Sequence, residues 1–197
     1  NEFNAEDVRK LKDDKIRLVP LLYKDETVKS LVDLNKLKAI LPLSCVIMAG
    51  GRGLRLRPFT ESTPKPLLKL QEKPIICHNI DRLRLYGITD FCITVNYLGE
   101  QIIDCLEAYY KDEDIMLTYI KEDKALGTIG AVSLIDSFKH DTILVMNADI
   151  LTTIDFEDYY MNFIASNHDL FVSSYNIKTD IPYAVMETSG DKILSFV

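Results

Sequence analysis

The sequence predicts an α/β fold in which a mainly parallel, Rossmann-like sheet carries helices on both faces. The first observation is that short apolar runs alternate with amphipathic segments beyond residue 43. The second is that glycine or polar residues follow several of these runs directly, as expected where buried strands end. Ligands bind beyond the carboxyl ends of the strands in such sheets, so we expect a site at that edge.

The predicted elements follow from hydrophobic periodicity. In residues 75–86, the side chains of Ile76, Ile80, Leu83 and Leu85 lie close to one helical face. Gly87 follows, as glycine commonly does at the end of a helix. The predicted helices are 75–86, 99–110, 129–137 and 156–166. The predicted strands are 45–48, 91–95, 115–120, 142–146 and 170–175, followed by a hairpin of residues 183–187 and 192–196 around Ser189-Gly190.

Residues 1–41 have a different pattern, and we place a boundary between them and a main domain of residues 44–197. Helices are predicted at 6–12 and 34–40, and strands at 16–22 and 28–32. This order resembles the latter half of a cystathionine-β-synthase (CBS) motif, in which Asp33 would match a position that often contacts ribose. A linker that packs on the main domain accounts for the pattern equally well, so both interpretations stay open.

Composition excludes several classes of function. The net charge of −7 disfavours a general nucleic-acid surface, and no apolar run approaches the length that spans a membrane. The four cysteines are widely spaced with no Cys-x-x-Cys pair, so neither a zinc site nor a disulfide framework is predicted. Reduced core thiols in a cytoplasmic protein are therefore expected.

The most informative segment is residues 48–66, which follows an apolar run and contains three glycines, four cationic side chains and three prolines. Glycines allow backbone N–H groups to approach a ligand, and the cations Arg52, Arg55, Arg57 and Lys65 suit a polyphosphate. The segment is not a P-loop, because no Gly-Lys-Ser/Thr run occurs. It is not the dinucleotide fingerprint either, because Leu56 occupies the place of the third glycine.

The unit Pro64-Lys65-Pro66 predicts a stiff tether for the lysine. A proline disfavours the α region for the residue before it, so extended backbone is expected at both Thr63 and Lys65.

Residues 45–197 resemble the nucleotide-binding part of the sugar-1-phosphate nucleotidylyltransferases, also called NDP-sugar pyrophosphorylases. The family signature is an apolar strand, then Ala-Gly-Gly-x-Gly-Thr-Arg-Leu-x-Pro-x-Thr, then Pro-Lys-Pro. Further matches in the family's order are Pro74-Ile75-Ile76 and residues 95–102, 127–131, 146–149 and 181–185.

The resemblance implies a fold of the nucleotide-diphospho-sugar transferase type, and it implies catalytic roles for three side chains. Arg55 would neutralise the leaving β- and γ-phosphates, with assistance from Arg52. Lys65 would hold the α-phosphate and the incoming sugar phosphate. Asp149 would be a ligand of Mg²⁺, a hard ion that suits a carboxylate at a strand end.

The remaining implied roles concern substrate binding. The backbone of Ala49, Gly50, Gly51 and Gly53 would wrap the base and phosphates, Gly127 would approach the base, and Asn96 would orient a loop or the ligand. Glu122 and Asp123 are two further acceptors for a base edge, although solvated carboxylates are the commoner interpretation. The backbone of Ala184 would approach the sugar.

Departures from the family pattern add side-chain volume near backbone that should contact ligand. They are Leu54 for Thr, Ala148 and Ala184 for Gly, and Ala125 and Ile129 for the usual Pro and Ala. The chain also ends at Val197, before the family's Glu-Lys-Pro and a second metal aspartate. We therefore expect a domain truncated at the carboxyl end, with little turnover by itself.

The resulting hypothesis is transfer of NMP from an NTP to a sugar 1-phosphate, which gives NDP-sugar and pyrophosphate. The run Gly127-Thr128-x-Gly130-Ala131 resembles the mannose-1-phosphate guanylyltransferase branch, so GTP is the expected nucleotide. The alternatives are a regulatory relative that binds NTP without transfer, and a cytidylyl or thymidylyl transferase acting on another sugar phosphate or on phosphocholine. Neither nucleic acid nor membrane is an expected partner, and a homo-oligomer is compatible with the sequence.

Overall fold

The computed structural model describes residues 5–122, 126–127, 129–177 and 186–196. It divides into two compact units, residues 1–162 and 163–197, which we describe separately. No helix in the described ranges is both long and apolar enough to cross a membrane.

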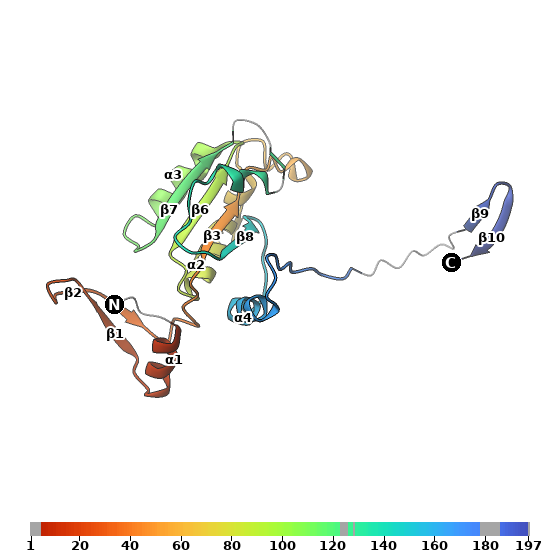
Figure 1. Ribbon diagram of the computed structural model, residues 1–197. Coiled ribbons are helices and arrows are strands. Elements are labelled where there is room, and N and C mark those ends of the chain that lie inside the picture. Colours follow the sequence, from red (N-terminus) through yellow and green to blue (C-terminus); the bar gives the residue numbers. More distant parts are fainter. Residues whose placement is uncertain (1–4, 123–125, 128, 178–185, 197) are drawn as a thin grey trace. The chain divides into compact units, whose positions relative to one another are not determined.

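A four-stranded parallel sheet forms the centre of the first unit (Figure 1). Its strands are β3 (Ser44–Met48), β6 (Asp90–Val95), β7 (Met116–Lys121) and β8 (Ile143–Asn147), in the order β7-β6-β3-β8. Cys45 pairs with Phe91 on one side and Leu144 on the other. All four strands were predicted, and the mainly parallel sheet is confirmed.

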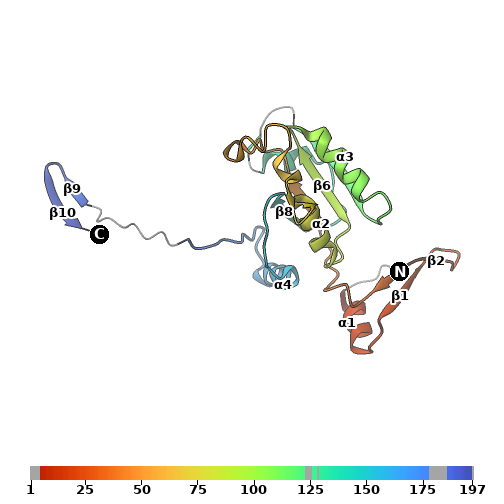
Figure 2. The ribbon, with the colours of Figure 1, turned by 180° about the vertical axis from the view of Figure 1, so that it is seen from behind.

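The two faces of this sheet are covered differently. Figures 1 and 2 show α2 (Ile75–Arg84) and α3 (Gly99–Tyr109) on one face, and the crossover from β7 to β8 over the other. Right-handed crossovers require this arrangement. The connections from β3 to β6 and from β6 to β7 add strands in one direction, whereas the connection from β7 to β8 returns to the other side of β3 and so crosses the opposite face. Among the described residues of that crossover, η3 (Gly130–Leu134), a 3₁₀ turn, is the only regular element.

The predicted α-helix at residues 129–137 is therefore wrong. Val132 N–H bonds to Ile129 O at 3.0 Å, the three-residue spacing of a 3₁₀ turn. The Ser133 hydroxyl donates to Gly130 O at 2.7 Å, and so occupies a carbonyl that a continuing α-helix would use. Ile135 is already extended, with φ −94° and ψ 115°.

The core lies between the sheet and α2–α3. Ile76, Ile80 and Leu83 are fully buried, as their shared helical face predicts. Leu85, predicted for the same face, is 37% exposed because α2 ends at Arg84. The Tyr86 ring packs edge-on against Phe156 at 5.4 Å between centroids, which joins the end of α2 to the start of α4 (Phe156–Ser166).

The segment before the sheet contains α1 (Ala5–Asp13) and an antiparallel hairpin of β1 (Leu18–Leu22) and β2 (Val28–Asp33). These three elements were predicted. The predicted helix at residues 34–40 is wrong, because other partners take its backbone groups. Asp33 Oδ1 accepts from Asn35 N–H at 3.0 Å, and Lys38 N–H donates to Leu85 O at 2.6 Å.

Shorter elements connect the main ones. Two 3₁₀ turns, η1 (Leu54–Leu56) and η2 (Lys65–Leu67), lie in the segment after β3. A two-residue ladder of β4 (Lys69–Leu70) and β5 (Lys73–Pro74) then precedes α2.

The second unit holds an antiparallel hairpin of β9 (Met186–Ser189) and β10 (Lys192–Phe196), which confirms the prediction for its described part. Residues 183–185 lie outside the described ranges. The predicted strand at residues 170–175 is wrong: residues 170–177 have no regular structure. Leu170 and Val172 are exposed, and strand residues of this type need a paired neighbour, which no described segment provides.

Candidate functional site

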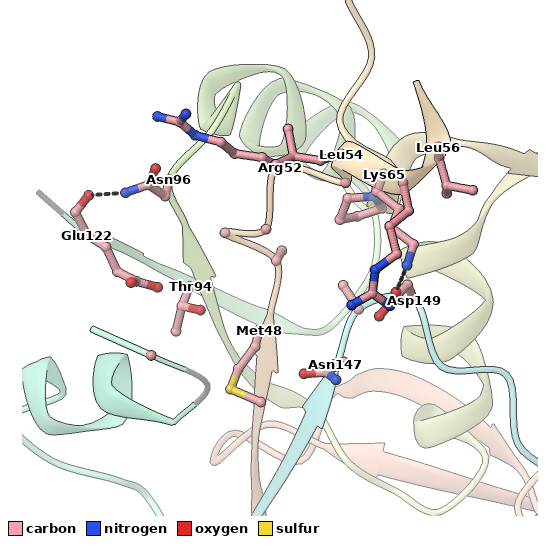
Figure 3. A pocket seen from close by; sticks show the side chains of 18 residues that line it. Met48, Arg52, Leu54, Leu56, Lys65, Thr94, Asn96, Glu122, Asn147 and Asp149 are labelled. Atoms are coloured by element: carbon pink, nitrogen blue, oxygen red, sulfur yellow. Dashed lines mark hydrogen bonds and ion pairs between the residues drawn. The ribbon is translucent and has the colours of Figure 1, made fainter. Parts of the chain in front are cut away.

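A cleft of about 870 Å³ opens at the carboxyl ends of β3, β6 and β8 (Figure 3). Every predicted site residue within the described ranges lines it: Ala49, Gly50, Gly51, Arg52, Gly53, Arg55, Lys65, Asn96, Gly127 and Asp149. Ala184 lies outside the described ranges. The sequence pattern predicted a site at the carboxyl ends of the strands, and these residues meet at that edge of the sheet.

Glycine is required at one point of the loop that follows β3. Gly53 has φ +61°, in the left-handed region. A Cβ there would lie 3.0 Å from Thr60 Cγ2 and 3.2 Å from Lys65 Cβ. The Thr60 hydroxyl also donates to Gly53 O at 2.8 Å, so the loop folds back tightly at this glycine.

The far part of this loop is bound to the turn before α3 and to the first turn of that helix. Tyr97 Oη donates to Glu61 O at 2.9 Å, and Gln101 Nε2 donates to Ser62 O at 3.2 Å. These two bonds hold the segment that leads into Pro64 and Lys65. The loop is therefore fixed from a second element as well as by its own turns.

Lys65 lies in a hydrogen-bonded turn, and its backbone is not extended. It begins η2, in which Leu67 N–H donates to Pro64 O at 2.8 Å. The expectation of extended backbone at Lys65 is therefore wrong, because the turn bond outweighs the local bias that Pro66 imposes. Pro64 itself is extended, with φ −63° and ψ 142°.

The Lys65 ammonium forms an ion pair with the Asp149 carboxylate inside the cleft, as Figure 3 shows. Asp149 follows β8, and its side chain is 28% exposed, against 35% for Lys65. A cation and a carboxylate that converge at the end of a parallel sheet are suited to phosphate and to a phosphate-bound metal ion, respectively.

A second polar group lies on the opposite side of the cleft (Figure 3). Asn96 Nδ2 donates to Glu122 O at 2.6 Å, so this side chain holds the end of β7. The Glu122 carboxylate accepts from Leu126 N–H at 3.3 Å. A Cβ at Gly50 would lie 3.2 Å from both Glu122 Oε1 and Asn96 Cβ, so glycine allows this close approach.

The predicted arginines are exposed. In Figure 3 Arg52 extends over Asn96, away from the Lys65–Asp149 pair, while Arg55 lines the cleft from η1. Leu54, which replaces a family threonine, is 56% exposed and also lines the cleft.

Sequence reasoning missed several lining residues. Thr94 is buried, and its hydroxyl has no hydrogen-bond partner among the described residues. The others are Met48, Leu56, Pro66 and Asn147. Met48 and Asn147 are the last residues of their strands, a position that would have identified them.

The donor set of the cleft fits a metal ion that arrives with phosphate. No group of three or more His, Cys, Asp or Glu side chains suited to a metal occurs in the described part of the chain. Asp149 is the carboxylate on the Lys65 side of the cleft, and Mg²⁺ is commonly held by one or two carboxylates together with substrate phosphates and water. The site therefore fits Mg²⁺ bound jointly with a nucleotide.

The fold and this cleft define a nucleotide-binding α/β domain. Residues 44–197 match the family model described as nucleotidyl transferase, and the chain belongs to that family. The resemblance to sugar-1-phosphate nucleotidylyltransferases is thereby confirmed, whereas the CBS-like interpretation of residues 1–41 stays a prediction.

Similar curated proteins carry a consistent name. Mannose-1-phosphate guanyltransferase of Schizosaccharomyces pombe is 35% identical over 119 residues, which cover 59% of this chain and 33% of that protein. Mannose-1-phosphate guanyltransferase 2 of Candida glabrata is 37% identical over 116 residues, covering 57% and 32%. The chain thus spans about a third of the length of these relatives.

Solved structures agree with the fold. HddC from Yersinia pseudotuberculosis complexed with GMP-PN has a TM-score of 0.56 at 25% identity, covering 79% of this chain and 68% of that one. A putative glucose-1-phosphate thymidylyltransferase from Bacillus anthracis in complex with a sucrose has a TM-score of 0.55 at 26% identity, covering 64% and 51%.

Proposed function

We propose that this chain is the nucleotide-binding part of an enzyme that transfers GMP from GTP to mannose 1-phosphate, giving GDP-mannose and pyrophosphate. The observation that carries the proposal is the convergence of a glycine-rich loop, Arg55, Lys65 and Asp149 on one cleft at the strand ends. The mannose-1-phosphate guanyltransferases among its relatives support the choice of substrates.

The reaction needs positioning and charge neutralisation rather than a strong base. The attacking oxygen of the sugar phosphate is already ionised. It forms a bond to the α-phosphorus as the bond to the α,β-bridging oxygen breaks, and pyrophosphate leaves. Lys65 would hold the α-phosphate and sugar phosphate, and Arg55 would neutralise charge on the leaving group. Asp149 would hold Mg²⁺, which when bound neutralises phosphate charge.

The Glu122 carboxylate supports guanine as the base. Guanine presents two adjacent donors, N1–H and the N2 amino group, which match the two oxygens of a carboxylate. Thymine and uracil present one N–H on the corresponding edge. Glu122 lines the cleft on the side opposite Lys65 and Asp149, and Leu126 N–H anchors its carboxylate.

The proposal also covers the cellular location of the protein and the choice between transfer and binding alone. The four free cysteines suit a reducing compartment, so the cytoplasm is the proposed location. Arg55, Lys65 and Asp149 match phosphate and metal positions of the family, and their presence favours transfer over binding alone.

The test is pyrophosphate release by the full-length protein. GTP, CTP, dTTP and UTP are each supplied with Mg²⁺ and with mannose 1-phosphate, glucose 1-phosphate or phosphocholine. Release with GTP and mannose 1-phosphate is expected. Release with a different pair would replace these substrates, whereas a thermal shift with GTP but no release across the panel would indicate a regulatory nucleotide-binding relative.

A further inference from the structure

A buried amide on α2 contacts the segment that carries Asp149. Asn79 is 3% exposed and lies on the apolar face of α2, near Ile76, Ile80 and Leu83 in the helical repeat. Its Nδ2 donates to Ala148 O at 2.9 Å. A polar side chain in such surroundings is costly unless it is hydrogen-bonded, and this bond satisfies it.

The hydrogen bond from Asn79 to the Ala148 carbonyl bears on the cleft because of where this carbonyl lies. The Ala148 carbonyl and the Asp149 N–H belong to one planar peptide unit. On the other side of the residue, Ala148 N–H donates to Met48 O at 3.0 Å, which attaches it to β3. Asn79 therefore fixes the orientation of the peptide unit through which the chain passes from the end of β8 to Asp149.

The same helix holds the other end of this segment. Arg82, one turn after Asn79, donates from Nη2 to Ile154 O, and its guanidinium lies 5.6 Å from the centroid of the Phe156 ring. Residues 148–154 are thus bound at both ends by α2. Asp149 lies between these two anchors, next to the first.

We propose that Asn79 is a positioning residue for Asp149: by holding the Ala148–Asp149 peptide, it aims the carboxylate at the place where phosphate-bound Mg²⁺ is held. This rests on the proposed function. Asn79 does not touch substrate in this role, and it acts only through the peptide that it binds. If the Asn79–Ala148 hydrogen bond were purely structural, its loss would affect folding alone. In the proposed role, its loss affects the response of the protein to Mg²⁺.

The test compares Asn79→Leu, which has similar volume but no donor, with the matched control Ile80→Val, which trims a fully buried residue of the same helix. Thermal shifts of the full-length protein are measured with GTP alone and with GTP plus Mg²⁺. Asn79→Leu is expected to keep the shift with GTP alone and to lose at least half of the added shift from Mg²⁺. Ile80→Val is expected to keep both.

Steady-state kinetics provide the second readout. For Asn79→Leu we expect kcat to fall at least tenfold and the Mg²⁺ concentration for half-maximal rate to rise several-fold, with KM for mannose 1-phosphate within twofold. If Asn79→Leu does not fold, Asn79→Ala is used with the same expectations. A normal Mg²⁺ increment and kcat in the variant would overturn the positioning role. Absence of GTP binding and turnover in the wild type would instead overturn the proposed function.

Discussion

The ammonium group of Lys65 and the carboxylate of Asp149 form an ion pair on one side of the cleft. The lysine comes from the turn after Pro64, and the aspartate follows the end of β8. The pair therefore links the loop that leaves β3 to the end of the neighbouring strand. Both side chains are about a third exposed, and pairs of this kind add at most about 1 kcal/mol to stability. The main importance of the pair is therefore chemical, because nucleotide binding would engage both groups.

Replacing Lys65 by alanine should affect turnover far more than stability. We expect kcat/KM to fall at least about a hundredfold, because a cation that neutralises transition-state charge contributes roughly 3 kcal/mol or more. The melting temperature should fall by no more than about 4 °C. Kinetics and thermal unfolding of the same preparation provide the check, and equal losses of both would indicate a structural lysine.

Asp149→Asn should remove Mg²⁺-dependent turnover and leave the fold intact. Asparagine preserves the shape of the side chain but loses the charge that a hard cation requires. The measurement is the rate as a function of Mg²⁺ concentration, with circular dichroism as the control for folding. An unchanged rate would eliminate the role assigned to this carboxylate.

Gly53→Ala should destabilise the loop, whereas Gly51→Ala should not. An alanine at position 53 would have to adopt φ +61°, which costs roughly 1–2 kcal/mol, and its Cβ would press on Thr60. A Cβ at Gly51 meets nothing within 4 Å. We expect the melting temperature to fall by about 2–8 °C for the first variant only. Similar melting temperatures would show that the loop can relax around the added methyl group.

Glu122→Gln should weaken GTP selectively. Glutamine retains one acceptor oxygen, so the bond from Leu126 N–H is preserved while one of the two oxygens facing the base is lost. We expect KM for GTP to rise about tenfold, equivalent to about 1.4 kcal/mol.

The control for this variant is ITP, whose base lacks the N2 amino group. If Glu122 reads both donors of guanine, the substitution should affect ITP less than GTP. An equal effect on both nucleotides would place Glu122 outside base recognition.

The sheet and most of the cleft could be predicted because their signals are local. The runs that became β3 and β6 are short, apolar and followed by turn residues, and the cleft residues stand directly after such runs. Placement of Gly53 and Asp149 at one edge then follows from parallel topology alone.

Some of the wrong predictions came from interactions between distant parts of the chain, and others from local turn bonds such as the one from Val132 N–H to Ile129 O. Residues 34–40 have helical periodicity, but Lys38 bonds to Leu85, which only the folded protein brings near. The Asn79–Ala148 hydrogen bond could not be predicted from the sequence, because an amide within an apolar helix face gives no indication of its partner. Local pattern thus identified where the cleft lies, and tertiary hydrogen bonds decide how it is held.

The thiols provide a prediction of pH dependence. Burial raises the pKa of Cys77 to about 12 and that of Cys92 to about 11, from an ordinary value of 9.0. In the unfolded chain these thiols ionise above pH 9, whereas the folded protein keeps them protonated until higher pH. Their contribution to stability is therefore fully present below pH 9 and is lost as pH rises towards 11–12.

Two measurements check this prediction. Urea unfolding at pH 8 and pH 10 should give a lower free energy of unfolding at pH 10, and Cys92→Ala should make that decrease smaller. In a thiol assay at pH 8 the buried Cys45, Cys77 and Cys92 should stay unreactive until denaturant is added, when all four cysteines react. Rapid reaction of three or more thiols in the folded protein would contradict the burial that underlies the prediction.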